Sequence, residues 1–230
     1  FIFEEIKNYL INNSFINEEW NALNVLVQNA STVGLLDLKM LSYQEDNNFV
    51  FFDKLNSNKF KFLYLLGSDN LEFKKNNEFI VYQGSHGDRG AELADVIFPS
   101  STYTEQNGLY SNLEGRVQEC KKASYPIGES LEDWKIFNLI LKKLGKIDCL
   151  NNFETLRKET VNSVINFSQI NNLPKRLINK NDKVNSEFYS EEILIKKLDY
   201  YYTNSISRSS KTMSECRQIN EKIPKTGTNN

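Results

Sequence analysis

The sequence predicts an α/β domain in which a mainly parallel, open β-sheet is flanked by helices on both faces and is followed by an extended C-terminal arm. Three short apolar runs, at residues 60–66, 79–82 and 94–98, have the length and composition of buried strands. Apolar residues recur at helical spacing around these runs, most clearly at residues 134–144. Strands that alternate with helices favour a parallel sheet, because parallel neighbours need a crossover connection.

The composition is that of an ordinary globular protein. With 230 residues, of which 25% are charged and 40% hydrophobic, the chain is long enough for one large core or for one and a half domains. The net charge of -2 gives no reason to expect a nucleic-acid partner. No stretch approaches the roughly 20 apolar residues that a membrane-spanning helix needs. No targeting segment or initiator Met is visible at Phe1. We therefore expect a processed chain, or one that starts where another reading frame ends.

The ligands for a structural metal site are too few. Cys120, Cys149 and Cys216 are isolated and odd in number, and His86 is the single histidine. Structural zinc requires about four Cys or His ligands, and iron–sulfur clusters require a similar set of thiolates. We therefore expect no metal site in this chain by itself. All three thiols are expected to be reduced and partly buried.

The first forty residues predict two helices. Phe3, Ile6 and Leu10 share one helical face within the first ten residues. A second helix is expected after Asn17, which would cap it ahead of two acids in the first turn. Its apolar face would be formed by Trp20, Leu23, Val27 and Ala30, with Trp20 as a core anchor.

The strand region begins after an irregular stretch. Residues 42–58 are polar apart from one aromatic run, and they predict a surface loop with one short buried segment. The strand at 60–66 ends at Gly67, where Gly-Ser-Asp forms a polar turn. No G-x-G-x-x-G pattern follows this strand, so dinucleotide binding is disfavoured. The strand at 94–98 is stopped by Pro99, which cannot continue a ladder of backbone hydrogen bonds.

A glycine-rich loop follows the second strand. Gly84, Gly87 and Gly90 make it tight, and Arg89 lies within it. Backbone N–H groups beside glycine are able to hold an anion, but the P-loop pattern G-x-x-x-x-G-K-S/T is absent. His86 has no second His or Cys at ligand spacing, so we expect it to make one hydrogen bond within the loop.

A long polar loop leaves the carboxyl end of the third strand, which is where open α/β sheets bind ligands and partners. Asn107-Gly108 predicts a turn, because both residues tolerate positive φ. Asn112 is expected to cap backbone groups, and Arg116 to hold a carbonyl or carboxylate of a neighbouring segment. Glu114 and Arg116 would share one face of an extended segment, which does not suit an acid/base pair. The predicted structural or interface residues of this region are Asp95, Asn107, Gly108, Asn112, Glu114, Gly115 and Arg116.

The remaining chain predicts helices and an arm. Ser130–Asp133 has the pattern of a capping box ahead of a helix that ends at Gly145, with Trp134, Phe137, Ile140, Leu141 and Leu144 on its apolar face. Further helices are expected at residues 153–165 and 205–213, the latter capped by Ser205 or Ser207. The expected domains are residues 1–150 for a partial α/β domain, 151–165 for a helix packed on it, 166–217 for the arm with its short helix, and 218–230 for a disordered tail.

Several of these segments together resemble a known family. The runs A-E-L-A-D-V-I-F-P, E-Q-N-G, N-L-E-G-R-V-Q and P-I-G-E-S-L-E-D-W-K-I follow one another between residues 91 and 136 and resemble the signature of the molybdopterin-oxidoreductase superfamily. Residues 81–91 and 205–216 resemble one branch, the largest peripheral-arm subunits of respiratory complex I, which are iron–sulfur subunits of the 75 kDa type. The likeness runs from about Trp20 to Cys216 with gaps around 42–58 and 146–198, and it is the ordered series that is specific.

The resemblance implies a molybdopterin-oxidoreductase-like fold that does not hold the molybdenum cofactor. It implies a structural and assembly part of mitochondrial NADH:ubiquinone oxidoreductase, with no catalytic, cofactor-binding or metal-binding residues of its own. FMN and iron–sulfur clusters, which pass electrons from NADH to ubiquinone, are expected in partner chains. The expected location is the peripheral arm, on the matrix side of the mitochondrial inner membrane and without a direct membrane span.

The resemblance also implies a partner for the sheet. In the family, the cluster-binding domains and the first part of this α/β domain lie upstream of the matched region. We therefore expect a split subunit, in which a separate polypeptide carries the cluster-bearing N-terminal part and completes the sheet beside residues 60–66 and 79–82. Other peripheral-arm subunits of complex I are further expected partners. An interface that resembles a domain core cut in two would bury more than roughly 2,000 Å².

Two other functions remain open at this point. One is a C-terminal fragment of a molybdopterin-dependent oxidoreductase such as a formate dehydrogenase, in which residues 91–118 would line the cofactor. The other is a nucleotide-binding α/β domain, which the missing glycine fingerprint disfavours. The segment at 205–216 and the loop at 84–90 favour complex I.

Overall fold

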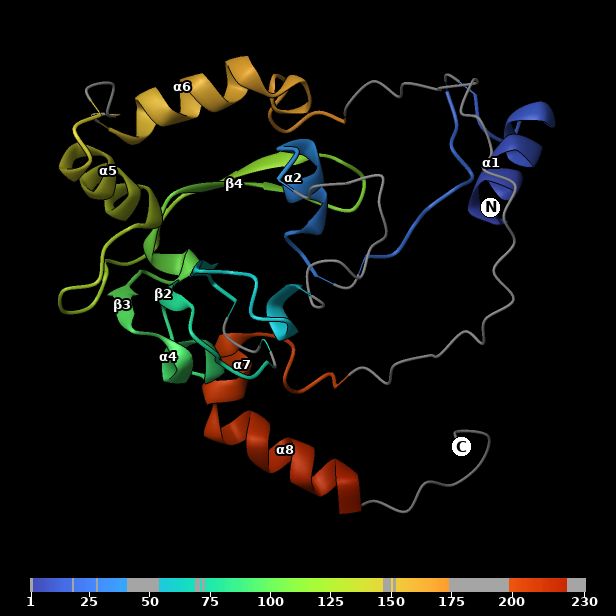
Figure 1. Ribbon diagram of the computed structural model, residues 1–230. Helices are drawn as coiled ribbons and strands as arrows, with labels where there is room; N and C mark the ends of the chain where they lie inside the picture. Colours follow the sequence, from blue (N-terminus) through green and yellow to red (C-terminus); the bar gives the residue numbers. More distant parts are fainter. Residues whose placement is uncertain are drawn as a thin grey trace. The chain divides into compact units, whose positions relative to one another are not determined.

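The computed structural model describes residues 2–17, 19–27, 29–40, 54–68, 71, 73–146, 150, 152–173 and 199–222. The chain divides into two compact units, which are shown together in Figure 1 and are described separately. The sheet unit comprises Tyr43–Asn107, Lys121–Phe153 and Lys196–Asn230. The hairpin unit comprises Phe1–Ser42, Gly108–Cys120 and Glu154–Ile195.

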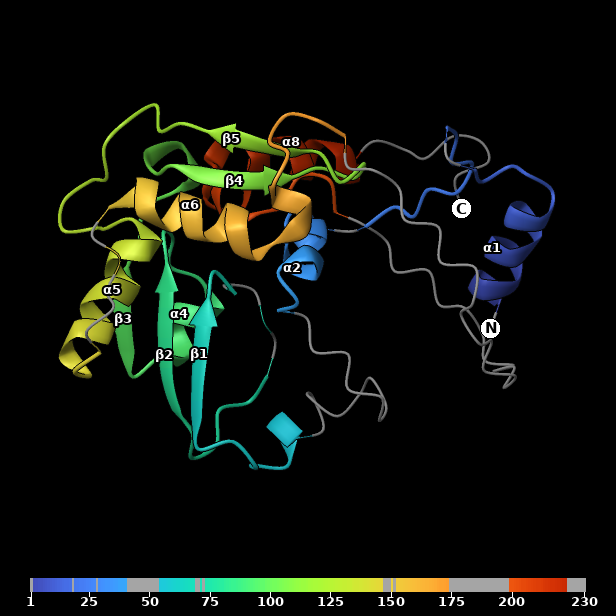
Figure 2. The same cartoon turned by 90° about the horizontal axis from the view of Figure 1, so that it is seen from above.

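The sheet unit contains three parallel strands, as the sequence predicts. They are β1 (Phe62–Leu66), β2 (Phe79–Gly84) and β3 (Val96–Pro99), and their spatial order is β1-β2-β3. Figure 2 shows the three strands side by side and pointing the same way. Leu63 lies opposite Ile80, and Tyr82 lies opposite Ile97. The three predicted strands are therefore confirmed, and the parallel sheet places their carboxyl ends at one edge.

One face of this sheet carries the main hydrophobic core. Its buried residues are Leu55, Leu63, Leu65, Ile80 and Tyr82. Helix α4 (Arg89–Leu93) packs Ala91 and Leu93 against them, and the β1–β2 connection adds Leu71 and Phe73. Both connections lie on the same face because crossovers between neighbouring parallel strands are right-handed.

Helix α5 (Asp133–Lys143) lies against the other face of the sheet. Its Phe137 ring stacks on Tyr64 of β1 with centroids 5.5 Å apart. Ile136 is the buried residue of this helix, whereas Phe137 and Leu144 of the predicted apolar face are exposed. Gly145 has φ of +72° and ends the helix, as predicted.

The predicted capping box of α5 is wrong. Glu132 is the N-cap residue and its side chain caps no backbone N–H group, whereas Asp133 N in the first turn donates to Gln106 Oε1 at 3.2 Å. Ser130 Oγ instead donates to the Ile127 carbonyl at 2.8 Å. The chain still turns at Ser130, because Leu131 forms a parallel bridge with Ser100 just after β3. The helix therefore starts only after this bridge.

The C-terminal part of the sheet unit contains two helices, α7 (Ser205–Ser209) and α8 (Lys211–Lys222), where the sequence predicts a single short one. Asn204, not Ser205 or Ser207, is the N-cap: its side chain accepts from Ser207 N, and the Ser207 side chain bonds Asn204 N in return. Ser210 is extended and separates the helices. Because α8 continues to Lys222, the predicted disordered tail cannot begin at residue 218; residues 223–230 lie outside the described part of the chain.

The hairpin unit is built around an antiparallel pair where the sequence predicts a polar loop. The pair is β4 (Gly108–Ser111) and β5 (Val117–Cys120), with Ser111 opposite Val117. The helices of this unit are α1 (Ile2–Asn12), α2 (Thr32–Asp37) and α6 (Phe153–Ser163), and α1 and α6 confirm predicted helices. Arg157 of α6 pairs with Glu119 at 3.3 Å, and Asn166 Nδ2 donates to Asp37 Oδ1 at 2.7 Å. Short 3₁₀ turns lie at Tyr103–Glu105 in the sheet unit and at Ile165–Phe167 in the hairpin unit.

The predicted second helix after Asn17 does not form among the described residues 19–27. Asn17 Oδ1 accepts from the backbone N–H groups of Glu19 and Trp20 at 2.9 and 2.8 Å, as a cap would. Ile16 then pairs with Asn21 in an antiparallel bridge, which closes a tight turn instead. Trp20 is 63% exposed, so its predicted role as a core anchor is wrong. The aromatic run at 49–52, Asp69 and Pro174 lie outside the described residues.

Candidate functional site

The carboxyl edge of the sheet holds a buried polar network. Gln83, near the end of β2, is fully buried. The Tyr64 hydroxyl of β1 donates to Gln83 Oε1, and Gln83 Nε2 donates to Asp133 Oδ1 at 2.6 Å. Asp133 lies in the first turn of α5, where the helix dipole favours an acid. The network thus joins two strands to the helix that covers them.

Gln106 completes this network from the loop after β3. Its Nε2 donates to Asp133 Oδ2 at 3.0 Å, and its Oε1 accepts from Asp133 N at 3.2 Å. We call Tyr64, Gln83, Gln106 and Asp133 the carboxyl-edge network. Burial, and then the negative charge of Asp133, raise the pKa of Tyr64 above its ordinary value. Tyr64 is therefore a neutral hydrogen-bond donor near neutral pH rather than a base.

A second charged cluster lies beside the first turn of α5. The Glu132 carboxylate is almost fully buried and accepts from Trp134 Nε1 and Lys135 Nζ, both at 3.0 Å, and from Lys122 Nζ at 3.3 Å. Burial by itself raises the pKa of Glu132, but these hydrogen bonds and the charge of Lys135 outweigh it and hold the pKa below its ordinary value. Glu132 is thus an ionised anchor for two lysines.

The glycine-rich loop at 84–90 is fastened by packing. Tyr82 Oη donates to the His86 carbonyl at 2.7 Å, and a Cβ on Gly84 would lie 2.2 Å from that hydroxyl. A Cβ on Gly90 would lie 2.7 Å from the Ser68 carbonyl. Ser85 Oγ and His86 Nδ1 are 2.9 Å apart, which confirms a loop hydrogen bond for His86. Close packing thus accounts for Gly84 and Gly90 without a ligand, whereas a Cβ on Gly87 would meet no close atom.

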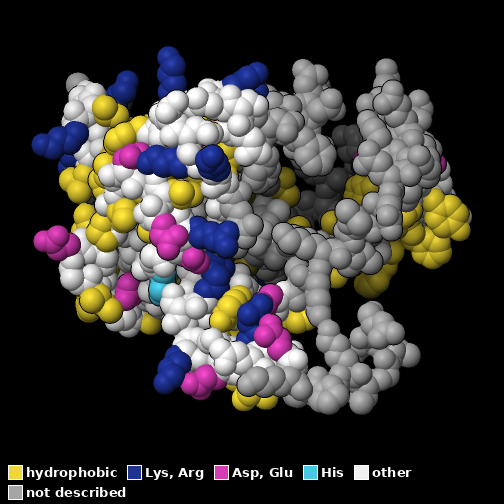
Figure 3. All heavy atoms as spheres, turned by 60° about the horizontal axis from the view of Figure 1, so that its bottom comes forward, with side chains coloured by type: hydrophobic (Ala, Val, Ile, Leu, Met, Phe, Trp, Pro, Cys, Tyr) yellow, Lys and Arg dark blue, Asp and Glu magenta, His cyan; other side chains and the backbone are white. Residues whose placement is uncertain are grey.

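The C-terminal helices reach this same loop. Asp88 caps α4 by accepting from Arg89 N at 2.9 Å, and its other oxygen accepts from Arg208 Nε of α7 at 2.9 Å. Arg217 of α8 pairs with Asp199 at 2.7 Å. On the face shown in Figure 3, basic and acidic side chains are intermixed in this way, without a large region of one sign. Such a surface does not favour a polyanionic partner.

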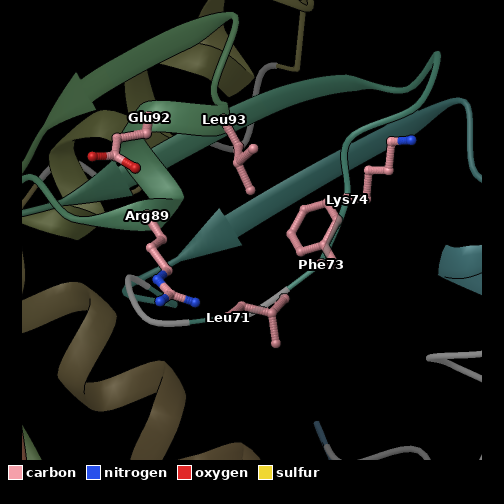
Figure 4. Close-up of a pocket in the computed structure, with 6 residues that line it drawn as sticks. All are labelled: Leu71, Phe73, Lys74, Arg89, Glu92 and Leu93. Atoms are coloured by element: carbon pink, nitrogen blue, oxygen red, sulfur yellow. The ribbon is translucent and has the colours of Figure 1, made fainter.

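An open hollow of about 460 Å³ lies on the core side of the sheet. It is lined by Leu71, Phe73, Lys74, Arg89, Glu92 and Leu93. Figure 4 shows Leu93 directed toward Phe73, while Lys74 points away from them. Half of its lining residues are apolar and half are charged, with charges of both signs, and none belongs to the carboxyl-edge network.

Asp95, the first of the predicted interface residues, fastens the amino ends of the strands. Its Oδ2 accepts from Ile80 N at 2.8 Å, and its Oδ1 pairs with Lys75 Nζ at 2.7 Å. These hydrogen bonds, that from Lys75 first, lower the pKa of Asp95. Asp95 therefore stands at the end of the sheet opposite to the carboxyl-edge network and belongs to the sheet unit.

The other predicted residues lie in or next to the β-hairpin. The expected turn at Asn107-Gly108 is wrong, because Gly108 begins β4 and Asn107 Oδ1 accepts from Lys122 N at 3.0 Å. The turn lies at residues 112–116, where Gly115 has φ of +81°. Gly108 pairs with Cys120 at the open end of the hairpin, and Ser111 pairs with Val117 next to the turn. The Asn-Gly pair therefore lies at the far end of the strands from the turn.

Asn112 organises this turn, and its predicted capping role is confirmed. Its Oδ1 accepts from Glu114 N at 3.0 Å and from Arg116 N at 2.9 Å. Arg116 Nη1 reaches the Asn171 carbonyl at 3.5 Å, and Glu114 is exposed. These contacts lie within the hairpin unit, so the role of this loop as an interface stays a prediction.

Sequence reasoning missed the carboxyl-edge network and Arg208. Gln83 and Asp133 are 50 residues apart, so no local spacing connects them. The available signals were a glutamine directly after an apolar strand and an acid opening a helix. Neither signal indicates which residue the side chain contacts.

Metal-ligand clusters and membrane-spanning helices are both missing from the described part of the chain. There, no group of three or more Cys, His, Asp or Glu residues is placed to hold a metal ion. Within the same residues no helix has the length and hydrophobicity to cross a bilayer. Cys120 is half-buried and not joined to Cys216, which is exposed rather than partly buried as expected. Cys149 lies outside the described residues.

Comparison with known proteins identifies two family matches. Residues 1–143 match the molybdopterin oxidoreductase family, and residues 172–216 match the family of C-terminal regions of NADH-ubiquinone oxidoreductase G subunits. The first match includes all three strands of the parallel sheet. The second contains Arg208, which contacts the glycine-rich loop.

Individual relatives agree with these matches. The NADH-ubiquinone oxidoreductase 75 kDa subunit of Reclinomonas americana is 36% identical, over 95% of this chain and 32% of the relative. The mitochondrial 78 kDa subunit of Candida albicans is 39% identical, over 88% of this chain and 28% of the relative. The mitochondrial 78 kDa subunit of Neurospora crassa is 34% identical, over 93% and 29%. This chain thus spans about a third of the length of the curated relatives it matches.

Proposed function

Because the chain belongs to the molybdopterin oxidoreductase family, and its relatives are named as NADH-ubiquinone oxidoreductase subunits, we propose that it is a non-catalytic structural part of the peripheral arm of mitochondrial NADH:ubiquinone oxidoreductase. In this role it supports electron transfer from NADH to ubiquinone through clusters that are held elsewhere. FMN and iron–sulfur clusters belong to partner chains.

The carboxyl-edge network carries this proposal. In open α/β sheets ligands bind outside the carboxyl ends of the strands. At this edge the Gln83 side chain donates to Asp133, and Gln106 donates to the same carboxylate from the loop. A pterin nucleotide brings phosphate groups, whereas the edge presents a carboxylate that is already hydrogen-bonded. This arrangement supports the proposal that the chain does not hold the molybdenum cofactor.

The neighbouring loop supports the same conclusion. Tyr82 packs against both Gly84 and Gly90, so the loop has no open cradle above these glycines. Arg208, which reaches the N-cap residue of α4, is already paired with Asp88. These contacts stabilise the loop without a ligand, which supports a structural role. Nothing in this geometry favours a formate-dehydrogenase-type fragment over the complex I assignment.

The proposed location is the matrix side of the mitochondrial inner membrane. Two relatives, from Candida albicans and Neurospora crassa, are named as mitochondrial. The proposed partners are the cluster-bearing N-terminal part of the same subunit and other peripheral-arm subunits. Whether that N-terminal part is a separate polypeptide is tested by the denatured mass of the native protein that contains this sequence. A mass near that of 230 residues supports the split subunit, and a mass about three times larger contradicts it.

Turnover per assembled complex tests whether the network is structural or catalytic. Asp133→Asn is expected to lower the amount of assembled complex while each assembled complex keeps the wild-type rate of NADH:ubiquinone oxidation. Glu129→Gln, a change of an exposed residue in the turn before α5, serves as the control and alters neither quantity. A large loss of turnover per complex in Asp133→Asn contradicts the proposal, because it would give Asp133 a part in the chemistry.

A further inference from the structure

The second face of the sheet carries an exposed aromatic surface. Phe62 and Phe79 stack across β1 and β2 with ring centroids 6.4 Å apart, and they are 55% and 48% exposed. Phe62 lies 6.5 Å from Tyr64, which stacks on Phe137 of α5. We call Phe62, Phe79, Tyr64 and Phe137 the aromatic face. Along α5 it is prolonged by Leu141 and Leu144, which are also exposed.

This exposure is unusual for a parallel sheet. Parallel sheets are normally covered by helices on both faces, because their strands are joined by crossovers. Here both connections, the one through Leu71 and Phe73 and the one through α4, pack on the opposite face. Within the described residues of the sheet unit, α5 packs on this side of the sheet at Tyr64. The Phe62–Phe79 end needs a covering element from elsewhere.

Strand β1 indicates the side of the sheet from which the covering element approaches. In the described part of the chain β1 pairs with β2 alone, so its outer edge is an edge of the sheet. Exposed apolar edges promote association, and natural proteins cover them with a helix or a loop. Phe62 belongs to this edge strand, and Phe79 is its neighbour on β2.

We propose that the aromatic face is the docking surface for an amphipathic helix from the part of the family's polypeptide that this chain does not span. This inference rests on the proposed function. The relatives are about three times as long as the matched region, so they contain ample chain to supply the helix. A helix is the element that parallel sheets use as cover, and its docking stripe would be apolar at three- and four-residue spacing. Its opposite side would be polar.

Photo-crosslinking in the assembled complex tests the proposal. Benzoyl-phenylalanine replaces Phe62 or Phe79, and Tyr125, which is 78% exposed and outside the aromatic face, is the matched control position. After irradiation, mass spectrometry is expected to place adducts from positions 62 and 79 on one helical segment of the unspanned part, and none there from position 125. Adducts within this chain, on a second copy or on another subunit contradict the proposal, and so does the absence of adducts.

A paired variant gives a second measurement. Phe62→Ser with Phe79→Ser is expected to reduce incorporation of the chain into the complex by about tenfold or more, as loss of two buried aromatic contacts does at interfaces. Tyr125→Ser is expected to incorporate normally. Wild-type incorporation of the double variant refutes the docking surface and leaves the proposed function standing. If the wild-type chain itself is missing from the complex, the proposed function fails.

Discussion

Asp133 Oδ1 accepts a hydrogen bond of 2.6 Å from Gln83 Nε2, and this contact fixes the start of α5 to the carboxyl end of β2. Gln83 is fully buried, so truncating it leaves both Asp133 and the Tyr64 hydroxyl with an unpaired group in a void. Gln83→Ala is therefore expected to destabilise the sheet unit by about 2–4 kcal/mol. Thermal and urea unfolding of the chain measure this change. Gln118→Ala, at an exposed position of β5, is the control, and equal effects of the two variants would refute the special role of Gln83.

The pair Arg208–Asp88 is expected to couple α7 to the glycine-rich loop. Asp88→Asn keeps an oxygen for the cap of α4 but removes the charge, and Arg208→Gln removes the other partner. Because the two groups are only partly exposed, a double-mutant cycle is expected to give a coupling energy of about 0.5–2 kcal/mol. Hydrogen exchange at residues 86–90 should speed up in each single variant. Additive effects and unchanged exchange would show that the pair does not hold the loop.

Glu132 predicts a specific dependence of stability on pH. Its pKa is below the ordinary value of 4.5 in the folded chain, so its ionised form is favoured by folding. This stabilisation is complete above the unfolded pKa and is lost as the pH falls through the lower folded pKa. Wild type is thus expected to be more stable than Glu132→Gln near neutral pH, and the difference should shrink in acid. Unfolding temperatures measured between about pH 3 and pH 7 test this, and a constant difference would contradict it.

Asn112 predicts a local effect in the hairpin unit. Its side-chain oxygen accepts two backbone hydrogen bonds, so Asn112→Ala leaves two N–H groups without this partner. The expected loss is about 1–2 kcal/mol in hairpin stability. Asn112→Asp retains the acceptor and is the matched control. Hydrogen exchange at Glu114 and Arg116 reads out the turn, and equal exchange in both variants would argue against the cap.

The strands were predictable because local signals define them. Each of the three apolar runs is bounded by a glycine, a proline or a polar turn, and nothing in the surroundings competes with the strand state. The segment after Asn17 was not predictable in the same way. Its apolar residues have helical spacing, but the side chains of Asn17 and Asn21 bond nearby backbone N–H groups and stabilise a turn.

The site was harder to predict than the fold. Asn112 was identified because an Asx turn is a local device whose partners lie two and four residues away. Asp95 was selected with the loop that follows β3, although its contacts lie at the amino end of the strands. The carboxyl-edge network depends on which strands become neighbours, so it appears only when the sheet is assembled.

Blue-native electrophoresis of mitochondrial membranes, followed by mass spectrometry of the bands, tests the central claim most directly. If the chain is a structural part of NADH:ubiquinone oxidoreductase, its peptides migrate in one band with the flavin- and cluster-bearing subunits of that enzyme. The same band shows NADH dehydrogenase activity. Peptides of this chain in a band without those subunits, or in a complex that contains molybdenum, would contradict the account.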